Sequence, residues 1–112
     1  MIYRVTARLK PDAAADFQRK LLDGTIAEQR PDGREIVASM QRALVSTSGE
    51  VTWRERCFCD TPLAHERQTV LDFHFEGLAT EEVDSLQEGI SPDGVGTPFM
   101  EYLAEIADRE SK

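Results

Sequence analysis

The sequence has few cysteines, few basic residues in its last third and no long apolar run. Its 112 residues include only two cysteines, too few for the disulfide framework of a small secreted protein. No stretch approaches the roughly 18 consecutive apolar residues that a membrane-spanning helix needs, and the start MIYRVTARLK lacks the order of a signal peptide. We therefore expect a cytoplasmic protein with reduced thiols and no membrane partner.

The common catalytic motifs are also missing. There is no Gly-rich phosphate loop, no Gly-x-Ser-x-Gly elbow and no His-Glu-x-x-His motif. The net charge of −8 is uneven, because residues 1–75 hold 11 acidic and 11 basic side chains, whereas 76–112 hold 10 acidic and 2 basic. An acidic field repels phosphate backbones, so nucleic acid is not expected as a partner. The acidic third is interpreted as a solvated helix face, with docking of a basic partner as the alternative.

The length predicts a single domain over residues 1–112, with an acidic helical C-terminal third over 77–112. Ile2–Leu9 alternates in polarity and is predicted to be a half-buried strand, with Tyr3, Val5, Ala7 and Leu9 on its apolar face. A helix is expected from about Pro11 to Asp23, where Ala14, Phe17 and Leu21 share one face. Two further helices are expected over Thr80–Glu88 and Thr97–Arg109, and in the second the spacing of Phe99, Tyr102, Leu103 and Ile106 places them on one face.

The segment Glu35–Thr47 is ambiguous, since Ile36, Met40 and Leu44 would also form a helical stripe. Cross-strand pairing favours a strand, with Ser48-Gly49 as a two-residue hairpin turn. The inner face of that hairpin would pair Leu44 with Trp53, Arg42 with Glu55, Met40 with Cys57 and Ala38 with Cys59.

Residues 61–77 allow two interpretations. Thr61 and Pro62 suit the start of a helix that runs toward Gly77, which is the favoured interpretation. The alternation within Thr69–Glu76 instead permits a fourth strand there.

These elements predict an α+β fold: a small antiparallel sheet of three strands, or four with Thr69–Glu76, covered on one face by three to four helices. In element order alone this resembles ferredoxin-like chains that dimerise through their sheets. The resemblance implies a homodimer and carries no function. The outer face of the sheet, with Arg4, Arg8, Arg54 and Arg56, is either solvated or an interface.

Arg42, Trp53 and Glu55 form the first candidate site. The predicted pair of Arg42 with Glu55 lies on the face that otherwise makes the core. Burying two charges costs several kcal/mol per ion, so such a pair is either a structural lock or the floor of a polar pocket. In a pocket, Arg42 would hold an anion, Glu55 would act as a general base and Trp53 would form an apolar wall.

The segment RERCFCDTP, residues 54–62, carries the second candidate site. Cys59 precedes a predicted helix start, which lowers a thiol pKa, and His65 would serve as its base, whereas Asp60 opposes thiolate formation. Zinc ligation by Cys57, Cys59, His65 and His74 is a further option, although Cys-x-Cys is a weak signal. The structural alternative is that both cysteines pack as small apolar residues.

The leading hypothesis is a small-molecule-binding protein, with a polar or anionic ligand held between sheet and helices by Arg42, Trp53, Glu55 and Cys57. Whether it is an enzyme stays open, and a reaction would be proton transfer involving Glu55, Cys59 and His65. The alternatives are an interaction module that uses the acidic C-terminal helices, and a zinc or reactive-thiol site at Cys57 and Cys59. The sequence identifies neither a cofactor nor a ligand.

Overall fold

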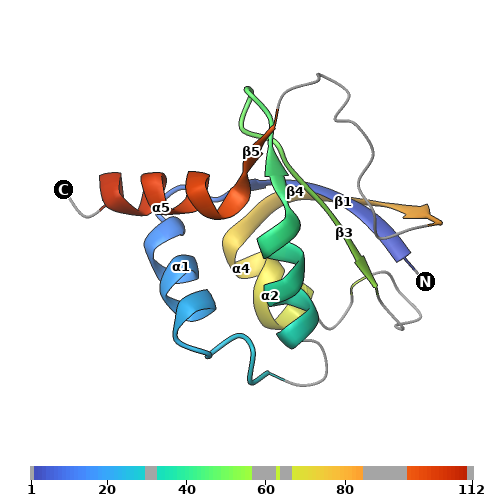
Figure 1. The fold of residues 1–112 in the computed structure, drawn as a ribbon, viewed down its shortest axis with the longest axis horizontal. Helices are drawn as coiled ribbons and strands as arrows, with labels where there is room; N and C mark the ends of the chain where they lie inside the picture. The colour runs from blue at the N-terminus through green and yellow to red at the C-terminus, as the bar shows by residue number, and fades with distance from the viewer. Residues whose placement is uncertain (1, 30–32, 57–62, 64–66, 85–95, 111–112) are drawn as a thin grey trace.

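The computed structural model describes residues 2–29, 33–56, 63, 67–84 and 96–110. Five strands form one antiparallel sheet in the order β4-β1-β3-β2-β5, and α1, α2 and α4 lie on one side of it (Figure 1). The elements are β1 (Ile2–Leu9), α1 (Ala14–Leu22), α2 (Gly33–Arg42), β2 (Leu44–Val45), β3 (Val51–Arg56), the π-helix η1 (Arg67–Leu71), α4 (Asp72–His74), β4 (Phe75–Val83), β5 (Thr97–Pro98) and α5 (Phe99–Glu110). The predicted α+β class with a ferredoxin-like outline is confirmed, with more strands than expected.

The first strand and the first helix follow the predicted patterns. Tyr3, Val5 and Ala7 of β1 are buried against the helices. In α1, Phe17 and Leu21 are buried on the expected face, together with Ala14. The secondary structure and the buried face of such a short periodic segment follow from its own sequence, because a single apolar face is enough to orient it against the core.

The predicted hairpin strand over Glu35–Thr47 is wrong. Residues Gly33–Arg42 form α2, and β2 is confined to Leu44–Val45. The register also differs, because Leu44 pairs with Thr52 instead of Trp53. The helical stripe prevails because it buries Ile36 and Met40 in the core.

The start of α2 lies tightly against the turn that precedes it. A Cβ atom on Gly33 would lie 2.0 Å from the carbonyl oxygen of Ile26 and 3.0 Å from that of Ala27. Only glycine allows this approach, so the position of α2 depends on a residue without a side chain.

The segment directly before β4 is helical over residues 67–74, as the favoured interpretation expected, but the helix ends short of Gly77. Its predicted start at Thr61 and Pro62 lies outside the described residues, and Leu63 lies in a turn with a φ of +57°. Arg67–Leu71 and Asp72–His74 are helical, so the alternative strand over Thr69–Glu76 is wrong as far as His74. The strand begins at Phe75 and runs to Val83, so the helix expected over Thr80–Glu88 is also wrong as far as Val83. Residues Phe75–Val83 form a strand because they pair with β1, and no local sequence pattern predicts that pairing.

The C-terminal helix closes the core as its spacing predicted. Phe99, Leu103 and Ala107 of α5 are buried. The rings of Phe99, Phe17, Phe75 and Trp53 follow one another with neighbouring centroids 5.1–6.1 Å apart. Such aromatic contacts each add about 0.5–1.5 kcal/mol beyond their buried area, so this row ties both terminal segments to the sheet.

The last residue of α5 caps the first turn of α1. Glu110 accepts hydrogen bonds from the backbone N–H of Ala14 at 3.0 Å and of Ala15 at 2.9 Å. The residue at the N-cap position of α1, Ala13, makes no capping side-chain hydrogen bond. The carboxylate of Glu110 therefore supplies from a distant part of the chain what a local Ser, Thr, Asp or Asn usually supplies.

Candidate functional site

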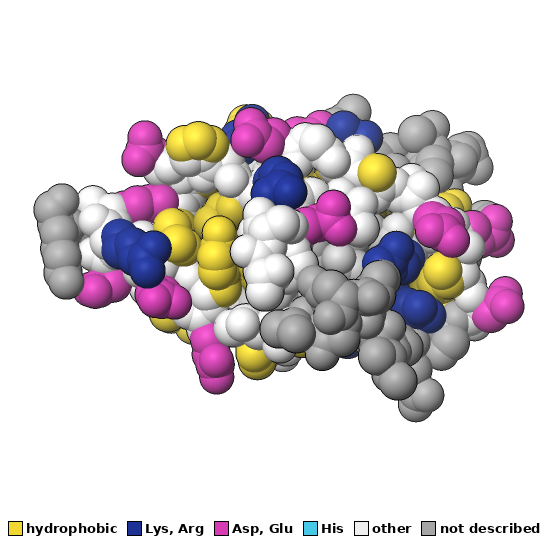
Figure 2. Space-filling view, turned by 90° about the horizontal axis from the view of Figure 1, so that it is seen from above, with side chains coloured by type: hydrophobic (Ala, Val, Ile, Leu, Met, Phe, Trp, Pro, Cys, Tyr) yellow, Lys and Arg dark blue, Asp and Glu magenta, His cyan; other side chains and the backbone are white. Residues whose placement is uncertain are grey.

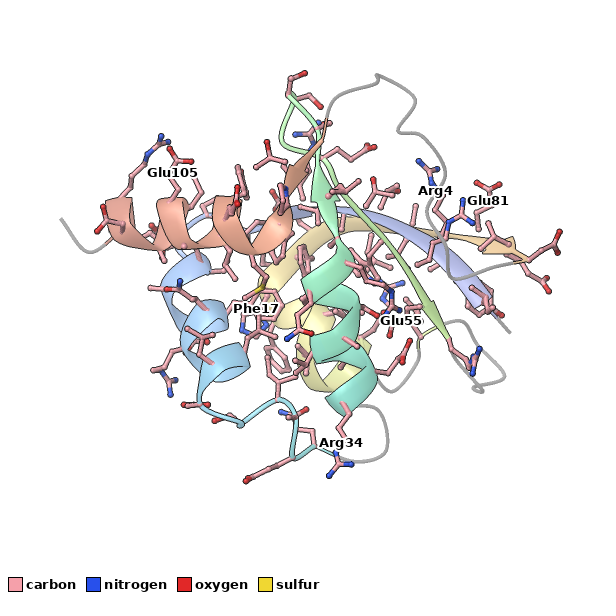
Figure 3. The ribbon with its side chains drawn as sticks, in the orientation of Figure 1. Arg4, Phe17, Arg34, Glu55, Glu81 and Glu105 are labelled. Atoms are coloured by element: carbon pink, nitrogen blue, oxygen red, sulfur yellow. The ribbon has the colours of Figure 1, made fainter. Side chains whose placement is uncertain are left out.

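Strand β3 places Trp53 and Glu55 on the face of the sheet that the helices cover. Alternate residues of a strand point to opposite faces, and here Val51, Trp53 and Glu55 are buried. Their cross-strand neighbours are residues of the β1 core face, with Tyr3 opposite Glu55. Figure 3 shows Glu55 projecting from β3 into the layer between the strand and α2. The sequence correctly placed Trp53 and Glu55 on one inner face.

Trp53 and Glu55 are joined directly. The indole Nε1–H of Trp53 donates a hydrogen bond of 2.7 Å to Oε1 of Glu55, and both side chains are 0 % exposed. The indole ring also packs on Phe75, with ring centroids 5.1 Å apart. An indole N–H can only donate, so Oε1 acts as the acceptor and the orientation of the carboxyl group is fixed.

A fully buried carboxyl group beside an aromatic ring is chemically unusual. Carboxylates seldom leave water unless hydrogen bonds or a binding partner offset a desolvation cost of several kcal/mol. Groups in such surroundings serve as general acids or bases, or bind a donor group of a ligand. Trp53 and Glu55 are therefore the described residues best suited to a site.

Arg42 does not occupy the cross-strand position that was predicted for it. It lies at the C-terminal end of α2, and its NH2 group lies 3.2 Å from Oε1 of Glu35. The same group donates to the carbonyl oxygen of Arg54 at 2.7 Å and to Ser39 Oγ at 3.3 Å. The ion pair of Arg42 is thus with Glu35 of its own helix, and the predicted pairing with Glu55 is wrong.

Glu35 and Arg42 together satisfy an edge of β3. Beyond Thr52, β2 no longer pairs with β3. There Arg42 donates to the Arg54 carbonyl, and Glu35 accepts from the backbone N–H of Arg56 at 3.1 Å. The helix side chains replace the hydrogen bonds that a longer β2 would have made, which protects an otherwise open strand edge.

This arrangement changes what Arg42 can do at a site. Its charge is already balanced by Glu35, so an incoming anion competes with a carboxylate 3.2 Å away. Its Nε atom is buried and has no hydrogen-bond partner among the described residues. Arg42 therefore favours a role as a positioning residue for β3 over a role as the principal anion ligand.

Three residues of the second candidate site, Cys57, Cys59 and His65, lie outside the described residues. The thiol and zinc hypotheses accordingly remain predictions. Among the described residues there is no group of three or more His, Cys, Asp or Glu side chains placed to hold a metal ion.

His74 is the one residue of the proposed zinc set that the structure describes. Its ring is 3 % exposed and stacks on Phe17, with centroids 4.5 Å apart. Nδ1 lies 2.8 Å from the carbonyl oxygen of Val70, and Nε2 lies 3.3 Å from Oδ2 of Asp16. A carbonyl only accepts, so Nδ1 carries a hydrogen here. With both nitrogens engaged inside the fold, His74 favours a structural role.

The sequence analysis did not identify Asp16, whose carboxylate contacts Arg19, Lys20 and His74. Lys20 lies 2.8 Å from its Oδ2, and Arg19 lies 2.9 Å from its Oδ1. The hydrogen bond from Lys20 is the largest influence on the pKa of Asp16 and lowers it. Desolvation comes next and raises the pKa, but the hydrogen bonds from Arg19 and His74 add to that from Lys20 and hold the pKa well below its usual value. The spacing of Asp16 and Lys20 is legible in the sequence, whereas the contact with His74 crosses 58 residues.

Comparison of this chain with models of protein families, with curated proteins and with solved structures finds no match. Within the described residues, none of the helices has the length and apolar character needed to cross a membrane. The basis for assigning a function is therefore the geometry of Trp53 and Glu55.

Proposed function

We propose that this chain binds a small polar molecule beside Trp53 and Glu55, between the inner face of the sheet and the helices. The observation that supports this proposal is the carboxyl group of Glu55, which is 0 % exposed and hydrogen-bonded at 2.7 Å to the indole of Trp53. A carboxylate in that setting binds a ligand that offers a hydrogen-bond donor. A donor-bearing ligand fits better than an anion because Glu35 already balances Arg42.

The roles in this proposal follow from the chemistry of each side chain. Glu55 accepts a hydrogen bond or a proton from the ligand, and Trp53 orients Glu55 while it presents an apolar ring. Arg42 holds the end of β3 in place through the Arg54 carbonyl. Any reaction at this position is proton transfer to Glu55, with Cys57, Cys59 and His65 as further candidates from the sequence.

Native mass spectrometry of the protein as purified, without chelator or reductant, is the first test. We expect one small-molecule adduct per subunit, which Glu55→Gln removes or weakens at least tenfold. Glutamine keeps an oxygen that accepts from Trp53 but removes the charge. Glu50→Gln is the matched control, because Glu50 is exposed beside the β2–β3 turn. A zinc mass in the same spectrum would support the cysteine hypothesis instead.

The single tryptophan makes the second readout direct. Trp53 is the only tryptophan in the chain, so its fluorescence reports on this position alone. A compound that binds there should change the Trp53 emission in the wild type and in Glu50→Gln, and have at least a tenfold weaker effect in Glu55→Gln. An adduct and an emission change that survive Glu55→Gln unchanged in a folded protein would contradict the proposal and leave a structural role.

We also propose that the chain forms a homodimer through the outer face of the sheet, the side seen in Figure 2, on which both basic and acidic side chains lie. Arg4 lies between Glu81 of β4 and Arg54 of β3 in one cross-strand row. Figure 3 shows Arg4 and Glu81 close together on that side. A two-fold axis parallel to β1 would place Glu81 of each copy opposite Arg54 of the other, and Arg4 opposite Arg4 between the two Glu81 carboxylates, so the two outer positions of the row pair opposite charges.

Sedimentation velocity of charge variants tests the dimer. Arg54→Glu should weaken self-association at least tenfold, and the swap Arg54→Glu with Glu81→Arg should restore it. A monomeric wild type at about 100 µM, a concentration at which even weak complexes form, would refute the dimer. Loss in the single variant without recovery in the swap would refute this axis.

A further inference from the structure

Strand β4 forms one long edge of the sheet. It has 9 residues and stands at the end of the strand order, whereas the opposite edge is the 2-residue strand β5. It runs along β1 to the end of the sheet near the N-terminus (Figure 1). Among the described residues no strand pairs with its outer side. An open strand edge is a template for pairing with another extended segment.

The direction of the β4 backbone groups follows from the other side of the sheet. In β3, the Arg54 carbonyl and the Arg56 N–H bond to side chains of α2, so these residues point away from β1. Backbone groups alternate in direction along a strand, so Glu55 and Trp53 exchange hydrogen bonds with β1. Their partners in β1 are Tyr3 and Val5.

The intervening β1 residues therefore bond to β4. Arg4 and Thr6 point toward β4, where their partners are Glu81 and Ala79. By the same alternation, the N–H and C=O groups of Thr80 and Glu82 point outward, along the open edge. The side chains of residues 79–82 are all exposed, so nothing in the described part of the fold covers this half of β4.

The acidic side chains along β4 favour a partner that carries positive charge. Residues 75–84 contain Glu76, Glu81, Glu82 and Asp84 and no Lys or Arg. A second β4 would bring the same carboxylates against these, which destabilises strand pairing. A phosphate-bearing partner is repelled for the same reason.

We propose that the outer edge of β4 binds an extended Lys/Arg-rich peptide segment of a partner protein as an added strand. The backbone of the peptide bonds to Thr80 and Glu82, and its basic side chains pair with the carboxylates of Glu81 and Glu82. A segment of about five residues spans Ala79–Val83 at one residue per strand residue. This surface is separate from the position of Trp53 and Glu55 and is independent of ligand binding there.

Fluorescence anisotropy with a labelled nine-residue peptide in which Lys-Lys pairs are separated by Thr and Val tests this proposal. Neighbouring residues of a strand point to opposite faces, so each Lys pair can reach both Glu81 and Glu82. We expect saturable binding that weakens at least tenfold between 50 and 500 mM salt, because surface ion pairs are screened over a distance of about 10 Å at 0.1 M. The same peptide with Glu in place of Lys should not bind. Equal binding of both peptides, or no binding of the Lys peptide at millimolar concentration, would overturn the proposal.

Two variants separate strand addition from simple charge attraction. Thr80→Pro removes an outward N–H but leaves the hydrogen bonds of Glu81 and Ala79 to β1, so affinity should fall at least about tenfold. Thr80→Ala keeps the N–H and should bind like the wild type. Glu82→Lys should also weaken binding at least about tenfold, whereas Glu101→Lys, an equal charge change on the exposed face of α5, should leave it within about twofold.

Amide hydrogen exchange gives a readout that needs no variant. In the free protein the Glu81 amide should exchange slowly, and the Thr80 and Glu82 amides should exchange fast. Saturating peptide should slow Thr80 and Glu82 at least tenfold. If peptide leaves both rates unchanged, or if Thr80→Pro binds as tightly as Thr80→Ala, the peptide does not add as a strand and the proposal is wrong.

Discussion

The cap that Glu110 places on α1 gives the sharpest stability prediction. Its carboxylate accepts from Ala14 at 3.0 Å and from Ala15 at 2.9 Å, and Ala13 offers no local cap in its place. Loss of a helix cap costs about 1 kcal/mol, and a carboxylate at a helix start adds about 0.3–1 kcal/mol through the helix dipole. We expect Glu110→Ala to lower the free energy of unfolding by about 2 kcal/mol.

Urea denaturation followed by Trp53 fluorescence measures this change. A loss of about 2 kcal/mol corresponds to a fall of about 8 °C in Tm for a domain of this size, which a thermal scan checks independently. Glu110→Gln keeps one uncharged acceptor oxygen and should lose about half as much. Glu110→Ala should therefore unfold at the lowest urea concentration, Glu110→Gln at a higher one and the wild type at the highest.

Glu105→Ala is the control, because it removes the same charge from the same helix. Glu105 projects from the outer side of α5 (Figure 3) and forms an exposed pair with Arg109 at 3.2 Å. Exposed pairs of this spacing contribute about 0.3–0.5 kcal/mol. If Glu110→Ala costs no more than Glu105→Ala, the long-range cap does not stabilise α1 and the reasoning is refuted.

Two more predictions concern single positions in the fold. The hydrogen bond from Lys20 lowers the pKa of Asp16 below its usual 3.8, so the contribution of Asp16 to stability is complete above pH 3.8 and is lost as the pH falls below 3.8. In urea titrations, the wild type and the control Asp12→Asn should therefore lose more stability between pH 7 and pH 3 than Asp16→Asn does. Equal losses in all three proteins would contradict the pairing of Asp16 with Lys20. Gly33→Ala should lower the free energy of unfolding by about 3 kcal/mol or more, because its Cβ would lie 2.0 Å from a backbone oxygen. Gly24→Ala, which has open space around it and a φ of +89°, should lower it by about 1–2 kcal/mol. Equal decreases in Tm for the two variants would refute the close packing at Gly33.

The elements that the sequence determined are those whose burial pattern is local. In β1, alternation alone identified Tyr3 and Val5 as core residues, and in α5 the spacing of Phe99 and Leu103 identified the buried face. Trp53 and Glu55 were placed together because both belong to one strand with a period of two. One buried face of one segment was enough in each case.

The errors arose where two interpretations satisfied the same residues. Residues 35–44 fit both a helical stripe and a hairpin register, and the balanced pairs, such as Arg42 with Glu55, favoured the wrong one. In the structure, side chains of α2 make the hydrogen bonds that the predicted strand would have made, because Arg42 and Glu35 bond to backbone groups at the edge of β3. No local pattern distinguishes a strand from a helix that satisfies the same edge.

The sequence by itself determined the α+β class, the core faces of β1, α1 and α5, and the shared face of Trp53 and Glu55, since each depends on periodicity within one segment. Only the tertiary structure decided that Thr80–Val83 is an edge strand, that Glu110 caps α1 and that Asp16 meets His74. These contacts join residues far apart in the chain, and their free energy exists only after the fold has brought the partners together.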